Sequence, residues 1–512
     1  MKPVCFILLL AVSLLAQQAT LELPPRELTQ KEAEIANRPT PTSLLLKTLK
    51  PADRSGIQPV SGMRNVLEYG AVGDGKTKDT KAIQAALDAG GIVHFPPGIY
   101  LSGSVYLRSN GGLDLAPGAL LLASPDEADY NAVDFCPQNR PSQYSKVQIA
   151  NSDVITGVHL VIGVGVQNVV IRGGGAISGN REAFYDIPKD PRLIWRSQYI
   201  KWRPAETVWI CEGSDITVQD VRLYDAPFWT CLIQGCNNVR IDRVTVDMHQ
   251  WTRNGDGITI DGCKNAVVTN CFVRSGDDCI VIKDDHRRLT KGQPCENVIV
   301  SNCVLDSICG GVRIGVGNGA MRNILCENLH IYSRIGCYLG INWGMVYLVE
   351  NVTFSNIILD CETAVAIYRS DNQLKRPPQD ISLRHLRFRN IRGTAMRAFI
   401  VDANFPVQDV VIEDFEITLR GPDYSRCPYR ELPKNRAPVE LHRIDGLSIS
   451  KMRVIWDRPN DCFTSPINLS EISHLKIDDC DFGGRPEWGG PQGYPLPTEK
   501  ELEYMEKFKQ YR

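Results

Sequence analysis

The sequence predicts an all-β protein built as a parallel β-solenoid, in which each coil of chain stacks on the one before it. Two observations support this prediction. A polar residue followed by alternating β-branched residues recurs through the middle of the chain, and the second residues of these openings are 23, 27, 32, 26 and 28 residues apart, at Ile216, Val239, Ala266, Val298, Ile324 and Val352. Steps of this size, with strand alternation inside each, indicate one coil per repeat.

The repeat openings begin with a residue that favours turns. The seven clearest are Asn168, Asp215, Asn238, Asn265, Asn297, Asn323 and Asn351, and weaker ones continue to about residue 477. A β-sandwich is the alternative, but sandwiches have shorter intervals between turns. Because the strand openings recur while their spacing varies, loops of different length must project from one face. Loops on a rigid stack are where a binding cleft is built.

The N-terminal part of the solenoid is expected to be closed by a short helix. Apolar residues at 82, 83, 86 and 87 share one helical face behind Asp79, a plausible N-cap. Strands follow at Ile92–Phe95 and at about Tyr100–Leu107. A helix placed just before a β array can cover the unpaired edges and the core at its open end.

The flanking segments are assigned by composition. Residues 1–19 read as a secretory signal peptide, and the apolar run from Val4 to Ala16 is shorter than the ~20 residues that a membrane span requires. We therefore expect a secreted or periplasmic protein with no membrane span. Residues 20–62 are expected to be a loosely attached leader, residues 63–485 the β-helix domain, and residues 486–512 a tail with a short helix.

Charge and cysteine content exclude several classes of function. A formal net charge of −2 provides no basic stripe for a phosphate backbone, so nucleic acid is not an expected partner. Several of the 17 cysteines recur at equivalent places in successive strands, which favours small core residues over disulfides. Bridges between Cys231 and Cys236, or Cys427 and Cys462, stay open. Two close cysteine pairs of the kind that bind zinc are absent, so neither a metal nor a cofactor is expected.

Two acidic turns stand out from the repeats. They read Asn254-Gly255-Asp256-Gly257 and Ser275-Gly276-Asp277-Asp278-Cys279, and Asp256 and Asp277 are 21 residues apart, about one coil. Neighbouring coils rise by ~5 Å, so the three carboxylates should meet. Like charges this close raise one another's pKa, and a turn needs only one acid for its conformation. The arrangement therefore indicates catalysis.

At these turns the chain resembles glycoside hydrolase family 28, the polygalacturonase-like pectin hydrolases. Asn254-Gly255-Asp256 is similar to the family's Asn-Thr-Asp motif, and Gly276-Asp277-Asp278-Cys279 matches its Gly-Asp-Asp-Cys motif. The resemblance implies a right-handed parallel β-helix and hydrolysis by single displacement with inversion. It also implies that Asp277 is the general acid, and that Asp256 with Asp278 positions and deprotonates the water. The expected partner is a pectin-type or related polysaccharide or oligosaccharide, bound by a monomer.

Two motifs of the family are missing. Where the family has Gly-His-Gly, this chain has Cys309-Gly310-Gly311, and where it has Arg-Ile-Lys, which grips the galacturonate carboxylate, this chain has Tyr338-Leu339-Gly340. Without that cationic pair, ordinary endo-polygalacturonase activity is not expected. Arg313 is expected one coil beyond Asp277, where it would either bind an anionic sugar or lower the pKa of a neighbouring aspartate.

Residues near the acidic turns are candidates for binding substrate. The polar candidates are Asn254, Lys283 and Arg313, and the aromatic ones, which could stack on the apolar face of a sugar, are Trp229, Trp251 and Tyr338. Two other functions stay open. In a polysaccharide lyase or epimerase on the same fold, the acids would hold calcium and Lys283 or Arg313 would take the proton. The third is a carbohydrate-binding solenoid without catalysis.

Overall fold

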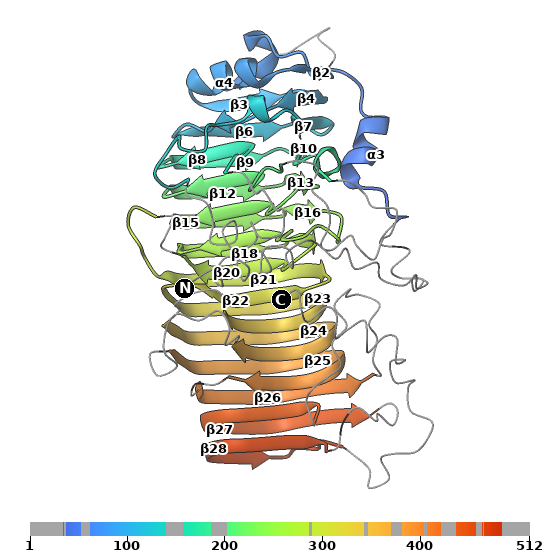
Figure 1. The fold of residues 1–512 in the computed structure, drawn as a ribbon, viewed down its shortest axis with the longest axis vertical. Coiled ribbons are helices and arrows are strands. Elements are labelled where there is room, and N and C mark those ends of the chain that lie inside the picture. Colours follow the sequence, from blue (N-terminus) through green and yellow to red (C-terminus); the bar gives the residue numbers. More distant parts are fainter. Residues whose placement is uncertain are drawn as a thin grey trace, which may run out of the picture.

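The structure, a computed structural model, describes residues 34, 37–52, 62–139, 157–185, 202–285, 289–342, 347–369, 381–403, 405, 407–420, 437–456, 463 and 465–483. Strands stack from one end of the molecule to the other in a single parallel β-helix (Figure 1). Most strands pair in register with their equivalents one coil away; Ile260, for example, lies between Ile233 and Ile282. The predicted parallel solenoid is confirmed.

The elements follow the chain from the capped end. The helices are α3 (Pro41–Thr48) and α4 (Thr80–Asp88), with single 3-10 turns η1 (Val66–Tyr69), η2 (Glu127–Asp129) and η4 (Arg181–Ala183). The first strands are β1 (Met63–Asn65), β2 (Asp74–Lys78), β3 (Ile92–Phe95), β4 (Gly98–Ser102), β5 (Val105–Tyr106), β6 (Gly111–Leu115), β7 (Ala119–Ala123), β8 (Val161–Val164), β9 (Gln167–Arg172) and β10 (Ala176–Ser178).

The remaining strands form the middle and the far end of the stack. Those before and around the acidic turns are β11 (Val208–Cys211), β12 (Ser214–Gln219), β13 (Arg222–Tyr224), β14 (Cys231–Gln234), β15 (Asn237–Asp242), β16 (Thr245–Asp247), β17 (Ile258–Asp261), β18 (Lys264–Thr269), β19 (Phe272–Ser275) and β20 (Ile280–Asp284). Longer, bent strands complete it: β21 (Cys295–Ser307), β22 (Gly310–Gly317), β23 (Ala320–Asn342), β24 (Leu348–Arg369), β25 (Ser382–Asp402), β26 (Val407–Leu419), β27 (Val439–Trp456) and β28 (Ile467–Asp478).

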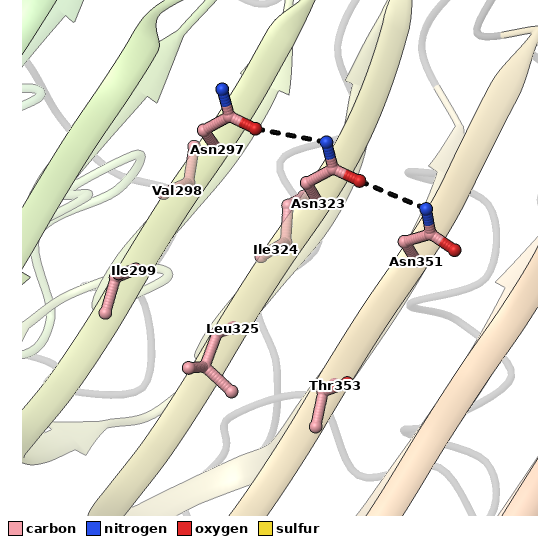
Figure 2. A pocket seen from close by; sticks show the side chains of 8 residues that line it. All are labelled: Asn297, Val298, Ile299, Asn323, Ile324, Leu325, Asn351 and Thr353. Carbon is pink, nitrogen blue, oxygen red and sulfur yellow. Dashed lines mark hydrogen bonds between the residues drawn. The ribbon is translucent and has the colours of Figure 1, made fainter.

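An asparagine ladder marks one corner of the coils. Asn265, Asn297, Asn323 and Asn351 all have left-handed backbones, with φ between 55° and 59°. Each donates from its side-chain amide to the equivalent residue of the previous coil, and three of those bonds measure 3.0 Å. Figure 2 shows two of them, between Asn297, Asn323 and Asn351. Asparagine tolerates this conformation better than most residues, which explains why it opens the repeats.

The interior of the solenoid is a continuous apolar column. Residues that alternate along each strand point inward, and among the described cysteines most are buried free thiols in this column, including Cys263, Cys271 and Cys295. The prediction that the cysteines are core residues is thus confirmed. Cys231 and Cys236 are both free, so no bridge joins them. Cys427 and Cys462 lie outside the described residues.

Helix α4 covers the first coil, as the sequence predicts (Figure 1). Its residues Ile83, Ala86 and Leu87 are buried in the core. Asp79 is the N-cap residue, but its carboxylate does not cap the helix. It accepts hydrogen bonds from the backbone of Val72 (2.7 Å) and Gly73 (2.9 Å) and so secures the preceding loop. The strand expected over Tyr100–Leu107 is divided into β4 and β5.

The segment before the solenoid is docked on its side. The Thr42 amide donates to the buried Asp225 carboxylate at 2.7 Å, and Arg38 pairs with Asp247 at 3.2 Å. Leu45 and Leu49 pack against an apolar cluster on the outside of the strands. A loosely attached leader is therefore wrong for residues 37–52, because complementary polar and apolar contacts hold that segment. The expected signal peptide and the C-terminal tail of residues 486–512 lie outside the described residues.

The structure bears on the membrane in one respect. Over the described part of the chain, no helix combines the length and the apolar character that crossing a bilayer would require.

We predict that Asn323→Ala lowers the free energy of unfolding by about 2–3 kcal/mol, because alanine disfavours the left-handed backbone and removes two ladder bonds. Asn323→Gly is the matched control. It loses the same bonds but keeps the backbone free to adopt the turn, so it should cost about 1 kcal/mol less. Urea unfolding would measure both. Wild-type stability in Asn323→Ala would show that the ladder does not stabilise the coils.

Candidate active site

The two acidic turns lie side by side on neighbouring coils. One leads from β16 into β17, and the other from β19 into β20. The Gly257 amide donates to the Asp278 carbonyl at 3.0 Å, and the Asp277 amide donates to the Gly255 carbonyl at 3.1 Å. The backbone ladder therefore places Asp256 beside Asp278. The separation of 21 residues, taken as one coil, predicts Asp277 at that position instead. All three carboxyl groups nevertheless meet.

Glycines allow the two turns to approach each other. A Cβ atom on Gly276 would lie 2.3 Å from the Thr252 carbonyl oxygen, and one on Gly257 would lie 2.5 Å from the Cys279 carbonyl oxygen. These contacts are too short for any other residue, since the clash would be with rigid backbone. The glycines serve close packing of the turns, which brings the acids together.

Burial and mutual repulsion shape the protonation of the acids. Burial and the nearby Asp278 charge together raise the pKa of Asp277 to about 7, although the Arg313 charge opposes them. Burial, with Asp277 and Asp278 as neighbours, holds the pKa of Asp256 well above its usual range. Lys283 and Arg313 counter this in part. Protons bound by such a cluster belong to the group as a whole.

Arg313 forms an ion pair with Asp278. Its guanidinium donates to Asp278 Oδ2 at 2.9 Å, and its charge opposes the raised pKa of Asp277. Among the described residues, the other oxygen, Asp278 Oδ1, has no hydrogen-bond partner. It faces Gly310, where a Cβ would lie 2.2 Å away. Asp278 Oδ1 therefore packs directly against Gly310, in the space that a side chain at position 310 would need.

Hydroxyl and thiol groups from its own coil and from the following coil support the Asp277 turn, a role that the sequence did not indicate. The Ser275 hydroxyl donates to the Asp277 carbonyl at 2.8 Å, and the Ser307 hydroxyl donates to the same oxygen. The Cys309 thiol is hydrogen-bonded to the Asp277 side chain. Burial beside Asp277 and Asp278 keeps the pKa of Cys309 well above its usual range. Only the coil register could have located these neighbours.

Tyr338 occupies the place of the missing cationic motif. Its ring lies against Gly340, where a Cβ would be 2.6 Å from the ring, so glycine makes room for the tyrosine. The Arg313 guanidinium lies 5.0 Å from the ring centroid, and Tyr368 packs edge-on at 6.2 Å. Tyr338 is half-buried. Of the three predicted aromatic platforms, it is the one with ring surface left at the site.

Trp229 and Lys283 form an internal pair. The Lys283 ammonium lies 3.7 Å from the Trp229 ring centroid and 3.9 Å from Asp261 Oδ2, and the residue is only 3% exposed. Trp229 also stacks on Phe228 at 4.9 Å and is 4% exposed. The lysine therefore adds positive charge near Asp256, while the tryptophan offers no open face to a sugar.

Asn254 and Trp251 lie in the loop before Asp256. Trp251 is 4% exposed and packs edge-on against His249. The fully buried Arg203 donates to the carbonyl oxygens of Pro227 (2.9 Å) and Arg253 (2.8 Å), and it reaches Asn254 Oδ1 at 3.4 Å. Arg203 thus anchors the first acidic turn. It comes from the long insertion before β11, and no sequence pattern singled it out.

The groove drawn in Figure 2 is a separate feature. It has a volume of about 410 Å³ and is lined by ladder asparagines and by Val298, Ile299, Ile324, Leu325 and Thr353. These residues belong to strands β21, β23 and β24. The groove contains none of the acids described above and offers no acid or base for catalysis.

Comparisons with known proteins agree with the fold and the motifs. The profile of the family described as "Glycosyl hydrolases family 28" matches residues 145–437, more than half of the chain, and that of "Rhamnogalacturonase A/epimerase, pectate lyase-like" matches residues 63–111. A probable polygalacturonase of Vitis vinifera is 25% identical over 297 residues, which are 55% of this chain and 57% of that protein.

A second relative and a solved structure are also similar to this chain. An exo-poly-alpha-D-galacturonosidase of Dickeya chrysanthemi is 26% identical over 304 residues, 52% of this chain and 49% of that protein. The chain thus spans about half the length of these two curated relatives. The structure of the family 28 exopolygalacturonase of Yersinia enterocolitica superposes with a TM-score of 0.53 at 18% identity, over 86% of this chain and 80% of that one. This likeness supports a right-handed parallel β-helix.

We predict that Arg203→Met lowers the free energy of unfolding by about 3 kcal/mol, because buried carbonyl oxygens lose their donor. Arg108→Met is the matched control. Arg108 is exposed and pairs only with the exposed Asp88, so its replacement should cost less than about 1 kcal/mol. Urea unfolding of the two variants would compare them. Equal losses would contradict the anchoring role of Arg203.

Proposed function

The chain belongs to glycosyl hydrolases family 28, and on that premise we propose that it hydrolyses glycosidic bonds in a pectin-type or related polysaccharide or oligosaccharide. The observation that carries the proposal is the unequal environment of adjacent carboxyl groups. Asp277 has a pKa of about 7, whereas Asp278 is hydrogen-bonded to a guanidinium. Glycoside hydrolysis needs one carboxyl that keeps a proton and another that has lost it.

Asp277 is the general acid in this proposal. At mildly acidic pH it carries a proton, which it can give to the departing glycosidic oxygen. The hydroxyls of Ser275 and Ser307 hold its backbone carbonyl, so the turn that presents the carboxyl is fixed from two coils. Such support limits the motion of the acid relative to the bound sugar.

Asp278 is the base that receives a proton from the water. Asp278 Oδ2 accepts a hydrogen bond from Arg313, and Oδ1 is left to accept one from the water. Asp256, on the neighbouring coil, also has a raised pKa, so it shares the protons that the cluster binds. It also helps to position the water.

The proposed reaction is a single displacement that inverts the anomeric carbon. Carboxyl groups of inverting pairs are usually ~6.5–9.5 Å apart, whereas oxygens of Asp277 and Asp278 approach within 4.8 Å. A water bound to Asp278 outside the space between the two carboxyls would supply the extra separation. The stereochemistry of the product therefore tests this mechanism.

The substrate grip differs from that of an ordinary endo-polygalacturonase. Tyr338 and Gly340 stand where the family has the arginine and lysine that hold a uronate carboxylate, and Arg313 and Lys283 are paired with Asp278 and Asp261. We propose that Tyr338 contacts the sugar at the cleavage point by its ring and hydroxyl. The protein is further proposed to be secreted, because its N-terminal sequence has the features of a signal peptide, and to act as a monomer.

We predict that Asp277→Asn lowers kcat/KM by about 10²–10⁴-fold, because asparagine cannot donate the proton. Asp114→Asn, far from the site in β6, is the matched control and should keep the wild-type rate. Reducing-end release from pectic oligosaccharides would measure both variants. Unchanged release by Asp277→Asn would refute the assignment. An unsaturated product that absorbs ultraviolet light would instead indicate the lyase alternative.

A second prediction concerns pH. Asp277 is protonated below its pKa of about 7 and ionised above it, so kcat/KM should fall as pH rises through about 7. An ordinary exposed aspartate, with a pKa near 3.8, would place the same loss far lower. The pH profile of initial rates would locate the alkaline limb. A midpoint below about pH 5 would contradict the raised pKa that burial gives this acid.

A further inference from the structure

Three potential metal ligands from two neighbouring coils meet at one edge of the acidic turns. The Cys309 sulfur and one carboxylate oxygen each from Asp277 and Asp278 all lie within 4.8 Å of one another. Asp277 and Cys309 are partly exposed, so an ion could reach them from solvent, whereas Asp278 is buried. Residues 277 and 309 are 32 positions apart, and the stacking of coils is what brings them together.

A second observation points to a ligand at the same place. Asp278 is 1% exposed, and among the described residues its Oδ1 has no hydrogen-bond partner. This oxygen packs against Gly310, the residue that follows Cys309 in the chain. Oδ2 is occupied by Arg313. A buried carboxylate oxygen that no donor satisfies is costly, and a bound cation would remove that cost.

We propose that Cys309, Asp277 and Asp278 form a binding site for a thiophilic divalent cation of the Zn²⁺ class. One sulfur, two carboxylate oxygens and a water would complete four-coordination. Tetrahedral ligands of zinc are about 3.5 Å apart, so small side-chain rotations would close the cluster from its present spread. The thiolate disfavours Mg²⁺ and Ca²⁺, which prefer oxygen ligands.

The ion would switch off the proposed hydrolysis, and this consequence rests on the proposed function. It would occupy the carboxyl groups of both the acid and the base, and it would displace the water from Asp278 Oδ1. Binding releases the Cys309 proton and any proton on Asp277, since both ligands must be ionised to coordinate. No zinc motif is visible in the sequence, because these ligands do not occur as close cysteine pairs.

Titration of the full-length protein with Cd²⁺ tests the site. A cadmium–thiolate bond absorbs in the ultraviolet by charge transfer, so the signal reports the sulfur ligand whether or not the protein hydrolyses anything. We expect Cys309→Ser to abolish the absorption that wild type develops. Cys480→Ser and Cys136→Ser, which alter two other partly exposed thiols, should keep it. Asp277→Asn retains the thiol and should weaken binding by about tenfold or more.

Two results would overturn the proposal: the same titration in Cys309→Ser as in wild type, or loss of the signal in Cys480→Ser or Cys136→Ser alone. If Cys309→Ser does not fold, unchanged affinity in Asp277→Asn would be enough. In a parallel assay, Zn²⁺ should inhibit the wild-type protein, and a chelator should restore the activity. The rate of each variant with Zn²⁺ is compared with the rate of the same variant without metal. Cadmium binding through Cys309 in a protein that cleaves no sugar would support the site and reject the proposed function.

Discussion

The backbone ladder between coils determines where every side chain of the site lies. Because strands such as β14, β17, β20 and β22 pair in parallel and in register, a residue at one position of a coil meets its equivalent about 4.8 Å away on the next. Asp256 and Asp278 are neighbours for this reason, and so are Asp277 and Cys309. A shift of one residue in this register would turn outward-facing acids into the core.

That register concentrates negative charge, and the surrounding residues offset it unequally. Arg313 bonds directly to Asp278, whereas Lys283 contacts Asp261 and Trp229 and its charge lowers the pKa of Asp256. Asp277 has no arginine or lysine of its own among the described contacts, and burial raises its pKa. One rigid scaffold therefore gives neighbouring carboxyl groups different electrostatic surroundings, which acid and base catalysis in one site requires.

Much of this arrangement could be predicted from the sequence. Asn297 and Asn323 reveal the coils because a left-handed corner restricts residue choice, and three acids in two glycine turns exceed what turn formation needs. The remainder depends on contacts that no local pattern encodes. Arg203 reaches the Asn254 turn from an insertion, and Trp229 is covered by Lys283 rather than open to sugar. Likewise, the docking of Thr42 on Asp225 joins segments 183 residues apart.

The stereochemistry of the first-formed product decides whether a water activated at Asp278 displaces the leaving group in a single step. NMR spectra recorded as the protein cleaves a defined pectic oligosaccharide would show the anomeric configuration of the new reducing end before mutarotation. Single displacement by water activated at Asp278 requires the configuration opposite to that of the cleaved bond. Retention would show that a carboxylate attacks the sugar itself, as the close approach of Asp277 and Asp278 would permit, and would contradict the account.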